Sequence, residues 1–351
     1  MVSFLHYWYY ELYDSAHAWY RGLRHNPRWL LMRQLSRFAL IRACVKRFQV
    51  RRNSDGASYR MSSGNFSGCR PGSSGDDRPS YSVLANASLD QVVRSIQQDG
   101  YFLGLQLSSP TVEAILDFAE QHPCLGNRYP HTGFYYAEKQ QAEAYFQTAF
   151  VTASYFNTAS SCAAIAQLGQ DPVLRSIAAA YLGREPVLIS SRLWWSFPSA
   201  ATMRDRRKSA QMFHYDRDDF VLLKFFFYLT DVDEGAGPHV CVRGTHRQKR
   251  WRHEWFGKQF SETLMVRSYG AANVVTICGR AGSGFAEDTF CFHRAVPPQQ
   301  RDRLILQLEY ALTDYGMERD TIDPTRVQVY TARSNSPGRA SPHRTGAIRL
   351  L

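Results

Sequence analysis

Two histidines and an aspartate have the residue types and the spacing of a metal site. His214 and Asp216 are separated by one residue, and alternate side chains of an extended strand point the same way, so both could contact one ion. His293 follows 79 positions later, where a strand-like run leads into a Pro-Pro turn. Two imidazoles and one carboxylate suit Fe(II) and leave three coordination positions open for a bidentate 2-oxo acid and O2. Alone, the His-x-Asp pair is weak: composition gives on the order of 0.6 chance occurrences, and a surface pair is the ordinary alternative.

An arginine ten positions after the last histidine has the chemistry to bind the far end of such a 2-oxo acid. Arg303 opens a strand-like run in which it shares one face with Ile305, Gln307 and Glu309, while the residues between them are apolar. Its planar, always charged guanidinium suits a carboxylate. Arg301 has the same parity, but Arg303 adjoins the apolar strand and is the preferred candidate. The alternative is a solvated arginine at the start of a strand.

The elements that must position these side chains are helices first and strands later. A Ser-x-x-Gln capping box, a Ser-Pro pair and an Asp-Pro pair indicate helices that begin near Ser88, Ser109 and Asp171. Runs rich in β-branched, aromatic and aliphatic residues then predict strands over 186–197, 220–230, 240–243, 273–277, 289–292 and 303–312. This order predicts an α+β fold whose strands form a sandwich or barrel. Trp194 and Trp195 are adjacent on one strand, so one should face the cavity and the other the core.

The order of these motifs resembles the phytanoyl-CoA dioxygenase family of Fe(II)/2-oxoglutarate-dependent oxygenases. The likeness rests on the His-x-Asp pair, on the stretch from Gly237 to His246 that ends in Gly-Thr-His, and on a distal histidine followed after ten residues by arginine. It covers roughly residues 83 to 312. The resemblance implies a double-stranded β-helix core, the jelly-roll of cupin-like proteins, with flanking helices and, in this chain, an N-terminal helical extension.

The resemblance also implies a role for each candidate residue. Fe(II) would be held by His214, Asp216 and His293, and Arg303 would form a salt bridge with the cosubstrate 2-oxoglutarate, with O2 as the other cosubstrate. The implied activity is hydroxylation of a small-molecule or lipid-like substrate, while 2-oxoglutarate is decarboxylated to succinate and CO2. The carboxylate of Asp216 separates the chain from related halogenases. The alternative from another class is a catalytically silent cupin-like scaffold or binding protein, targeted by a basic amphipathic leader.

Two basic loops flank the metal residues in the sequence. Residues 204–208 precede His214, and residues 246–256 interleave Trp251 and Trp255 with cations. They predict an anionic small-molecule substrate, and the alternative is solvated surface charge. No recognised nucleic-acid module is present, so nucleic acid is not predicted as a partner. Three further histidines are predicted to be structural or solvent-facing: His239, His246 and His253.

Positive charge is concentrated before the central domain. Residues 1–60 contain eleven Arg or Lys and three acidic residues, which accounts for +8 of the formal +11. Apolar residues recur at spacings of three and four and predict a basic amphipathic helix within residues 28–50. This helix would contact an anionic membrane or a protein partner, or would pack on its own domain. Composition divides the chain into a basic aromatic helical leader (1–52), a flexible linker (53–80), the dioxygenase-like domain (81–314) and a basic tail (315–351).

The composition excludes several broad classes of protein. With 44% hydrophobic and 21% charged residues, the chain is neither wholly disordered nor fibrous. No stretch approaches the roughly 18 uncharged apolar residues of a spanning helix, and no secretory signal pattern is present. We therefore expect a cytoplasmic protein, with peripheral membrane contact as an option. The seven cysteines are widely spaced without a C-x-x-C pair, which supports neither a disulfide framework nor a zinc site. The oligomeric state is left open.

Overall fold

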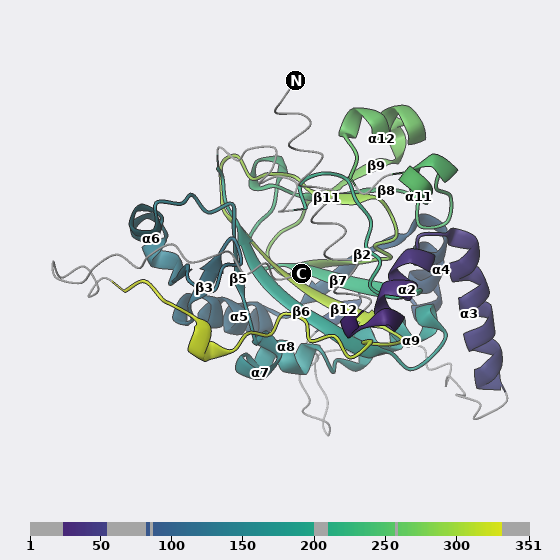
Figure 1. The fold of residues 1–351 in the computed structure, drawn as a ribbon, viewed down its shortest axis with the longest axis horizontal. Helices are drawn as coiled ribbons and strands as arrows, with labels where there is room; N and C mark the ends of the chain where they lie inside the picture. Colours follow the sequence, from purple (N-terminus) through teal and green to yellow (C-terminus); the bar gives the residue numbers. More distant parts are fainter. Residues whose placement is uncertain (1–23, 55–81, 85–86, 200–209, 257–258, 332–351) are drawn as a thin grey trace.

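Helices and antiparallel sheets build the fold (Figure 1), and the expected α+β class is confirmed at this level. The computed structural model describes residues 24–54, 82–84, 87–199, 210–256 and 259–331. Several sequence predictions therefore lie outside the described residues: the start of the leader at 1–23, the linker over 55–80, the basic loop at 204–208 and the tail over 332–351.

The helices are α2 (Pro27–Leu35), α3 (Ala39–Ser54), α4 (Leu89–Asp99), α5 (Ser109–Gln121), α6 (Lys139–Phe146), α7 (Thr158–Ser161), α8 (Ala163–Leu168), α9 (Pro172–Leu182), α11 (Trp251–Phe256) and α12 (Glu262–Tyr269). Capping explains where two of them begin. The Ser88 hydroxyl accepts from the backbone of Gln91 in a complete capping box before α4, and the Asp171 carboxylate accepts from two backbone N–H groups of α9. Both predicted starts are confirmed. The predicted start at Ser109 is confirmed as well, since α5 begins at Ser109 with Ser108 as its capping residue.

The strands are β1 (Ser82–Leu84), β2 (Tyr101–Leu107), β3 (Cys124–Gly126), β4 (Gly133–Phe134), β5 (Thr152–Tyr155), β6 (Val187–Ser196), β7 (Leu222–Tyr228), β8 (His239–Val242), β9 (Val274–Ile277), β10 (Ser283–Glu287), β11 (His293–Ala295) and β12 (Arg303–Ala311). They form a large sheet in the order β1-β2-β10-β7-β12-β6-β5-β3-β4 and a small sheet in the order β11-β8-β9. The predicted strand at 289–292 is wrong: these residues form the turn before β11.

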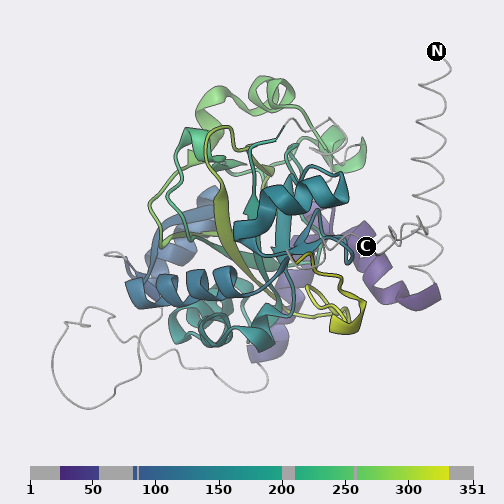
Figure 2. The same ribbon diagram turned by 90° about the vertical axis from the view of Figure 1, so that its left-hand side faces the viewer.

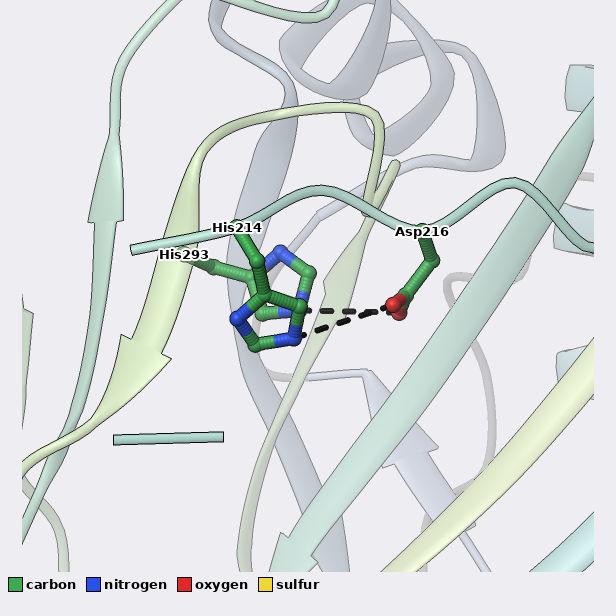
Figure 3. A group of neighbouring side chains, drawn as sticks. All are labelled: His214, Asp216 and His293. Atoms are coloured by element: carbon green, nitrogen blue, oxygen red, sulfur yellow. Dashed lines mark ion pairs between the residues drawn. The ribbon is translucent and has the colours of Figure 1, made fainter. Parts of the chain in front are cut away.

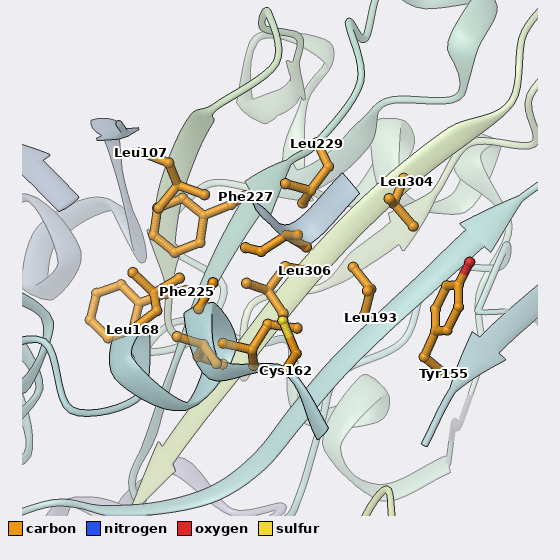
Figure 4. Packing of buried hydrophobic residues seen from close by; sticks show 14 of the residues in the cluster. Leu107, Tyr155, Cys162, Leu168, Leu193, Phe225, Phe227, Leu229, Leu304 and Leu306 are labelled. Atoms are coloured by element: carbon orange, nitrogen blue, oxygen red, sulfur yellow. The ribbon is translucent and has the colours of Figure 1, made fainter. Parts of the chain in front are cut away.

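Helices cover one face of the large sheet. The apolar side chains of β7 and β12 that point to this face pack against α4, α5, α8 and α9 in the largest hydrophobic cluster (Figure 4), which includes Phe225, Phe227, Leu304 and Leu306. Figure 2 shows the fold from the side, with the light-green helix α12 at the top of the view. Burying this face fixes the register of β7 and β12, since a slip of one residue would turn the apolar set away from the helices.

The small sheet packs against the other face of the large sheet. Phe226 and Tyr228 of β7 and Phe285 of β10 share a buried cluster with Cys241 and Ile277 of the small sheet. The polar face of β12 points into this space between the sheets, as the alternation of its sequence predicts. The candidate metal residues lie at the edge of the same space.

The N-terminal segment forms two helices instead of the single predicted helix. The helix breaks after Leu35, and α3 packs on the domain through cations: the guanidinium of Arg42 is buried, donates to the carbonyl oxygens of Ser36 (2.7 Å) and His246 (2.6 Å), and lies 4.0 Å from the ring centroid of Phe290. Of the apolar residues that carry the predicted periodicity on α3, Ile41 and Val45 are half-buried and Phe48 is exposed. In the part of the chain that the structure describes, no helix is both long and apolar enough to cross a membrane.

Candidate metal centre

The backbone brings the two predicted histidines face to face. His214 and His293 form an isolated antiparallel bridge, in which each backbone N–H donates to the carbonyl oxygen of the other residue at 3.0 and 2.9 Å. Their ring centroids are 4.4 Å apart. The N–H of Asp216 donates to the carbonyl of Thr289 (2.9 Å), so the loop before β11 fixes all three ligands (Figure 3). Segments 79 positions apart in the sequence thus meet through main-chain hydrogen bonds.

The side-chain hydrogen bonds aim both imidazoles at one point. Nδ1 of His214 lies 2.9 Å from the carbonyl oxygen of Met212, and Nδ1 of His293 lies 3.0 Å from that of Cys291. A carbonyl only accepts, so each Nδ1 carries the proton and each Nε2 presents a lone pair. These Nε2 atoms lie 3.7 and 3.5 Å from the carboxylate oxygens of Asp216, and the three ligand atoms are within 4.8 Å of one another. The predicted triad therefore converges.

The charge states of the ligands fit a divalent cation. Burial and, to a smaller extent, the nearby His214 lower the pKa of His293 to about 4, so this imidazole is neutral at physiological pH. Burial alone would raise the pKa of Asp216, but Lys224, His293 and His214 more than offset it and hold the pKa well below its ordinary value. Two imidazole nitrogens and one carboxylate form the donor set of a ferrous facial triad. The residues present therefore fit the implied metal.

Lys224 supports the aspartate, although no pattern in the sequence predicted this role. It lies in the middle of β7, in a run that is apolar on both sides, and it is buried. Its ammonium lies 2.8 Å from Asp216, 3.3 Å from Glu309 and 3.7 Å from Asp218. Burial would lower the pKa of this lysine, but the three carboxylates raise it above its ordinary value. Lys224 therefore stays charged and holds one oxygen of Asp216 by a hydrogen bond.

A buried carboxyl group lies next to Lys224 in the sheet. Glu287 of β10 is directly opposite Lys224 in register, and neither of its oxygens has a hydrogen-bond partner among the described residues. Burial raises the pKa of Glu287 to about 8 and lowers the pKa of His239 to about 3. Oε2 of Glu287 lies 2.6 Å from Nε2 of His239 without hydrogen-bond geometry, so at neutral pH this contact joins two uncharged groups and is no ion pair.

The protonation of Glu287 gives a pH-dependent stability. Its pKa is about 8 in the folded protein and is ordinarily 4.5, so the folded state keeps a proton that the unfolded state releases. The resulting stabilisation is fully present below about pH 4.5 and is lost as the pH rises towards 8. Between pH 4.5 and pH 8 the free energy of unfolding of the wild type should therefore fall as the pH rises. In Glu287→Gln this fall should be smaller, by up to about 1.4 kcal/mol per pH unit.

Urea unfolding of the metal-free protein from pH 5 to pH 8 measures this slope. Glu113→Gln is the matched control, because Glu113 is an exposed glutamate on α5 and should leave the pH dependence unchanged. Parallel curves for the wild type and Glu287→Gln would show that Glu287 is ionised in the folded protein.

Arg303 is buried at the start of β12. Its guanidinium donates to the carbonyl oxygen of Gly237 and, at 3.0 Å, to the hydroxyl of Ser196, while its Nε has no partner. Among the described residues no carboxylate forms an ion pair with it, and burial lowers its pKa. A buried cation without a counter-ion is costly, and an anionic ligand would remove that cost. Arg301, the competing candidate, is exposed and pairs with Asp233.

Residues at and just before the start of β8 contact both Arg303 and the metal ligand His293. Gly237 accepts from Arg303, and two residues later the His239 ring stacks on that of His293, with centroids 5.5 Å apart and planes at 13°. Arg303 also contributes, after burial, to the lowered pKa of His239. The arginine and the triad therefore face the same space between the two sheets.

The other predicted residues have mixed outcomes. His239, His246 and His253 are all buried, so the structural interpretation holds for them and the solvent-facing one does not. Trp194 packs with the cluster between the sheets, whereas Trp195 belongs to the cluster under the helices, which decides the open question of their orientation.

Comparisons with known proteins give distant structural likenesses. No family model and no curated protein match the chain. Solved structures do match it, and three crystal structures are given as examples. HygX from Streptomyces hygroscopicus with nickel and 2-oxoglutarate bound is 14% identical, with a TM-score of 0.47 over 66% of this chain and 88% of that one. The epimerase SnoN in complex with Fe3+, alpha ketoglutarate and nogalamycin RO is 17% identical, with a TM-score of 0.46 over 74% and 94%. AviO1 from Streptomyces viridochromogenes Tue57 is 15% identical, with a TM-score of 0.44 over 65% and 96%. These scores are too low to assign a function.

Proposed function

We propose that this chain is a non-haem Fe(II)/2-oxoglutarate-dependent dioxygenase that hydroxylates a small-molecule or lipid-like substrate. The observation that carries the proposal is the convergence of His214, Asp216 and His293, whose ligand atoms lie within 4.8 Å of one another. The buried Arg303, which pairs with no carboxylate of the described residues, supports it independently. The two packed antiparallel sheets agree with a double-stranded β-helix core, which is part of the proposal.

Each residue has a distinct task in this function. His214, Asp216 and His293 would hold the iron, and the carbonyls of Met212 and Cys291 keep both imidazoles in the tautomer that presents Nε2. When bound, the iron supplies the O2 chemistry that couples decarboxylation of 2-oxoglutarate to substrate oxidation.

The tasks of Lys224 and Arg303 follow from their charges. Lys224 keeps Asp216 ionised and oriented through the 2.8 Å hydrogen bond. Arg303 would bind the distal carboxylate of 2-oxoglutarate, and its burial excludes water from that pair. The cosubstrate is thereby oriented with its 2-oxo acid end towards the triad.

Anaerobic titration tests the function. Fe(II) and 2-oxoglutarate added together to the full chain should give a visible metal-to-ligand absorption band, and Fe(II) alone should not. On admission of O2, succinate should form. A full chain that gives neither the band nor succinate would favour the alternative of a catalytically silent scaffold.

A further inference from the structure

The outer face of α3 is apolar and exposed. Leu40 is 82% exposed and Phe48 is 70% exposed, and the exposed Cys44 lies between them at a helical spacing of four. The inner face carries the cations instead: Arg42 is buried, and the ammonium of Lys46 lies 4.2 Å from the ring centroid of Tyr181. The helix thus packs on its own domain through these cations and the half-buried Ile41 and Val45, and it presents Leu40, Cys44 and Phe48 to the surroundings.

Helix α11 extends this apolar surface. Trp251 and Trp255 are 61% and 56% exposed. The helix contacts the start of α3 directly, since the Trp255 ring centroid lies 4.9 Å from that of Phe38 and a carboxylate oxygen of Glu254 lies 3.3 Å from the backbone nitrogen of Ala39. Both helices lie at the outer edge of the molecule (Figure 1). We call this the α3–α11 surface, made of Leu40, Cys44, Arg47, Phe48, Trp251 and Trp255.

Cations surround the apolar side chains. Residues 24–54 contain nine Arg or Lys and no acidic residue. Arg47 is exposed beside Phe48, and Arg247, Arg250 and Arg252 are exposed on and before α11. Glu254, the acidic residue of α11, already accepts from the backbone of α3. The surface therefore combines exposed aromatic rings with positive charge that no exposed carboxylate of α3 or α11 offsets.

We propose that the α3–α11 surface binds an anionic membrane surface. Tryptophan and phenylalanine side chains partition into the boundary between headgroups and acyl chains, while arginines attract anionic headgroups. A helix at the outer edge of the molecule can lie flat on a bilayer, whereas an amphipathic partner helix would require a groove. The charge pattern requires an anionic bilayer, since a neutral one offers these arginines no net attraction.

Vesicle cosedimentation of the full chain tests the proposal. The wild type should sediment with equimolar phosphatidylserine–phosphatidylcholine vesicles, much less with pure phosphatidylcholine vesicles, and less at high salt. Leu40→Ser/Phe48→Ser should weaken binding about tenfold or more, because both side chains leave the acyl boundary. Arg47→Gln should weaken it roughly fivefold.

A matched control replaces two exposed apolar residues elsewhere. Tyr145 and Val187 are 45% and 42% exposed and lie on α6 and β6, so Tyr145→Ser/Val187→Ser should bind as the wild type does. Light scattering of the wild type and of the Leu40→Ser/Phe48→Ser variant measures whether each protein is a monomer or a dimer in solution. The proposal is overturned if the wild type stays in the supernatant, if both double variants bind equally, or if the apolar stripe instead supports a dimer.

Discussion

His293→Ala is expected to lose tight Fe(II) binding and to reduce succinate formation about 1,000-fold or more. Without this ligand the metal is not held, and the several kcal/mol by which a bound metal stabilises the charge of the transition state are lost. The fold should survive, because the bridge between residues 293 and 214 uses only backbone N–H and carbonyl groups, which alanine keeps. Two measurements check this result: Fe(II) titration of the metal-free protein, and succinate release at saturating 2-oxoglutarate.

His253→Ala is the matched control for His293→Ala. His253 is also buried, its Nδ1 lies 2.9 Å from the hydroxyl of Tyr269, and its ring centroid lies 5.8 Å from that of Phe292, so it shares the burial and the surroundings of His293 without being a ligand. It should lose some stability and retain Fe(II) binding. If His293→Ala binds Fe(II) as well as His253→Ala does, His293 is not a metal ligand.

Local signals explain why the positions of the triad and the helix starts could be predicted. The capping residues Ser88 and Asp171 act on backbone groups within three positions, so the sequence contains both partners of each interaction. The His-x-Asp pair likewise lies in one extended segment. His293 required the order of distant motifs, because its approach to His214 depends on long-range backbone hydrogen bonds.

Tertiary partners explain what the sequence could not show. Lys224 is buried in an apolar strand only because Asp216, Asp218 and Glu309 converge on it from other segments. The orientation of α3 depends on Arg42, whose buried acceptor on His246 is 204 positions away. Periodicity alone does not show that a cation of such a helix is buried against a carbonyl group far away in the sequence.

Strand β10 was missed for a related reason. Gly284 weakens the strand pattern, yet it is required there, because a Cβ at this position would collide with the Phe227 ring of the neighbouring strand. The close contact between β10 and β7 therefore requires a glycine, a residue type that is not typical of strands. Missing β10 also hid Glu287, the buried carboxyl group beside Lys224.

Arg303→Met is expected to raise the 2-oxoglutarate concentration needed for half-maximal succinate formation about 100-fold or more, because truncating one partner of a buried charge pair costs several kcal/mol. The metal-free, ligand-free protein should be as stable as the wild type or more so. The wild-type guanidinium is buried without a counter-ion among the described residues, and an apolar side chain of similar length removes that cost. Activity and stability are thus predicted to change in opposite directions.

Arg303→Lys separates the contribution of charge from that of geometry. The lysine keeps the positive charge but lacks the planar fork that pairs with a carboxylate through two hydrogen bonds, so its 2-oxoglutarate requirement should lie between those of the wild type and Arg303→Met. Thermal unfolding with and without 2-oxoglutarate provides a second measurement: the ligand should raise the melting temperature of the wild type and leave that of Arg303→Met nearly unchanged. A merely structural arginine would produce the reverse pattern, in which Arg303→Met is less stable and has an unaltered 2-oxoglutarate requirement, and that result would remove Arg303 from the binding site.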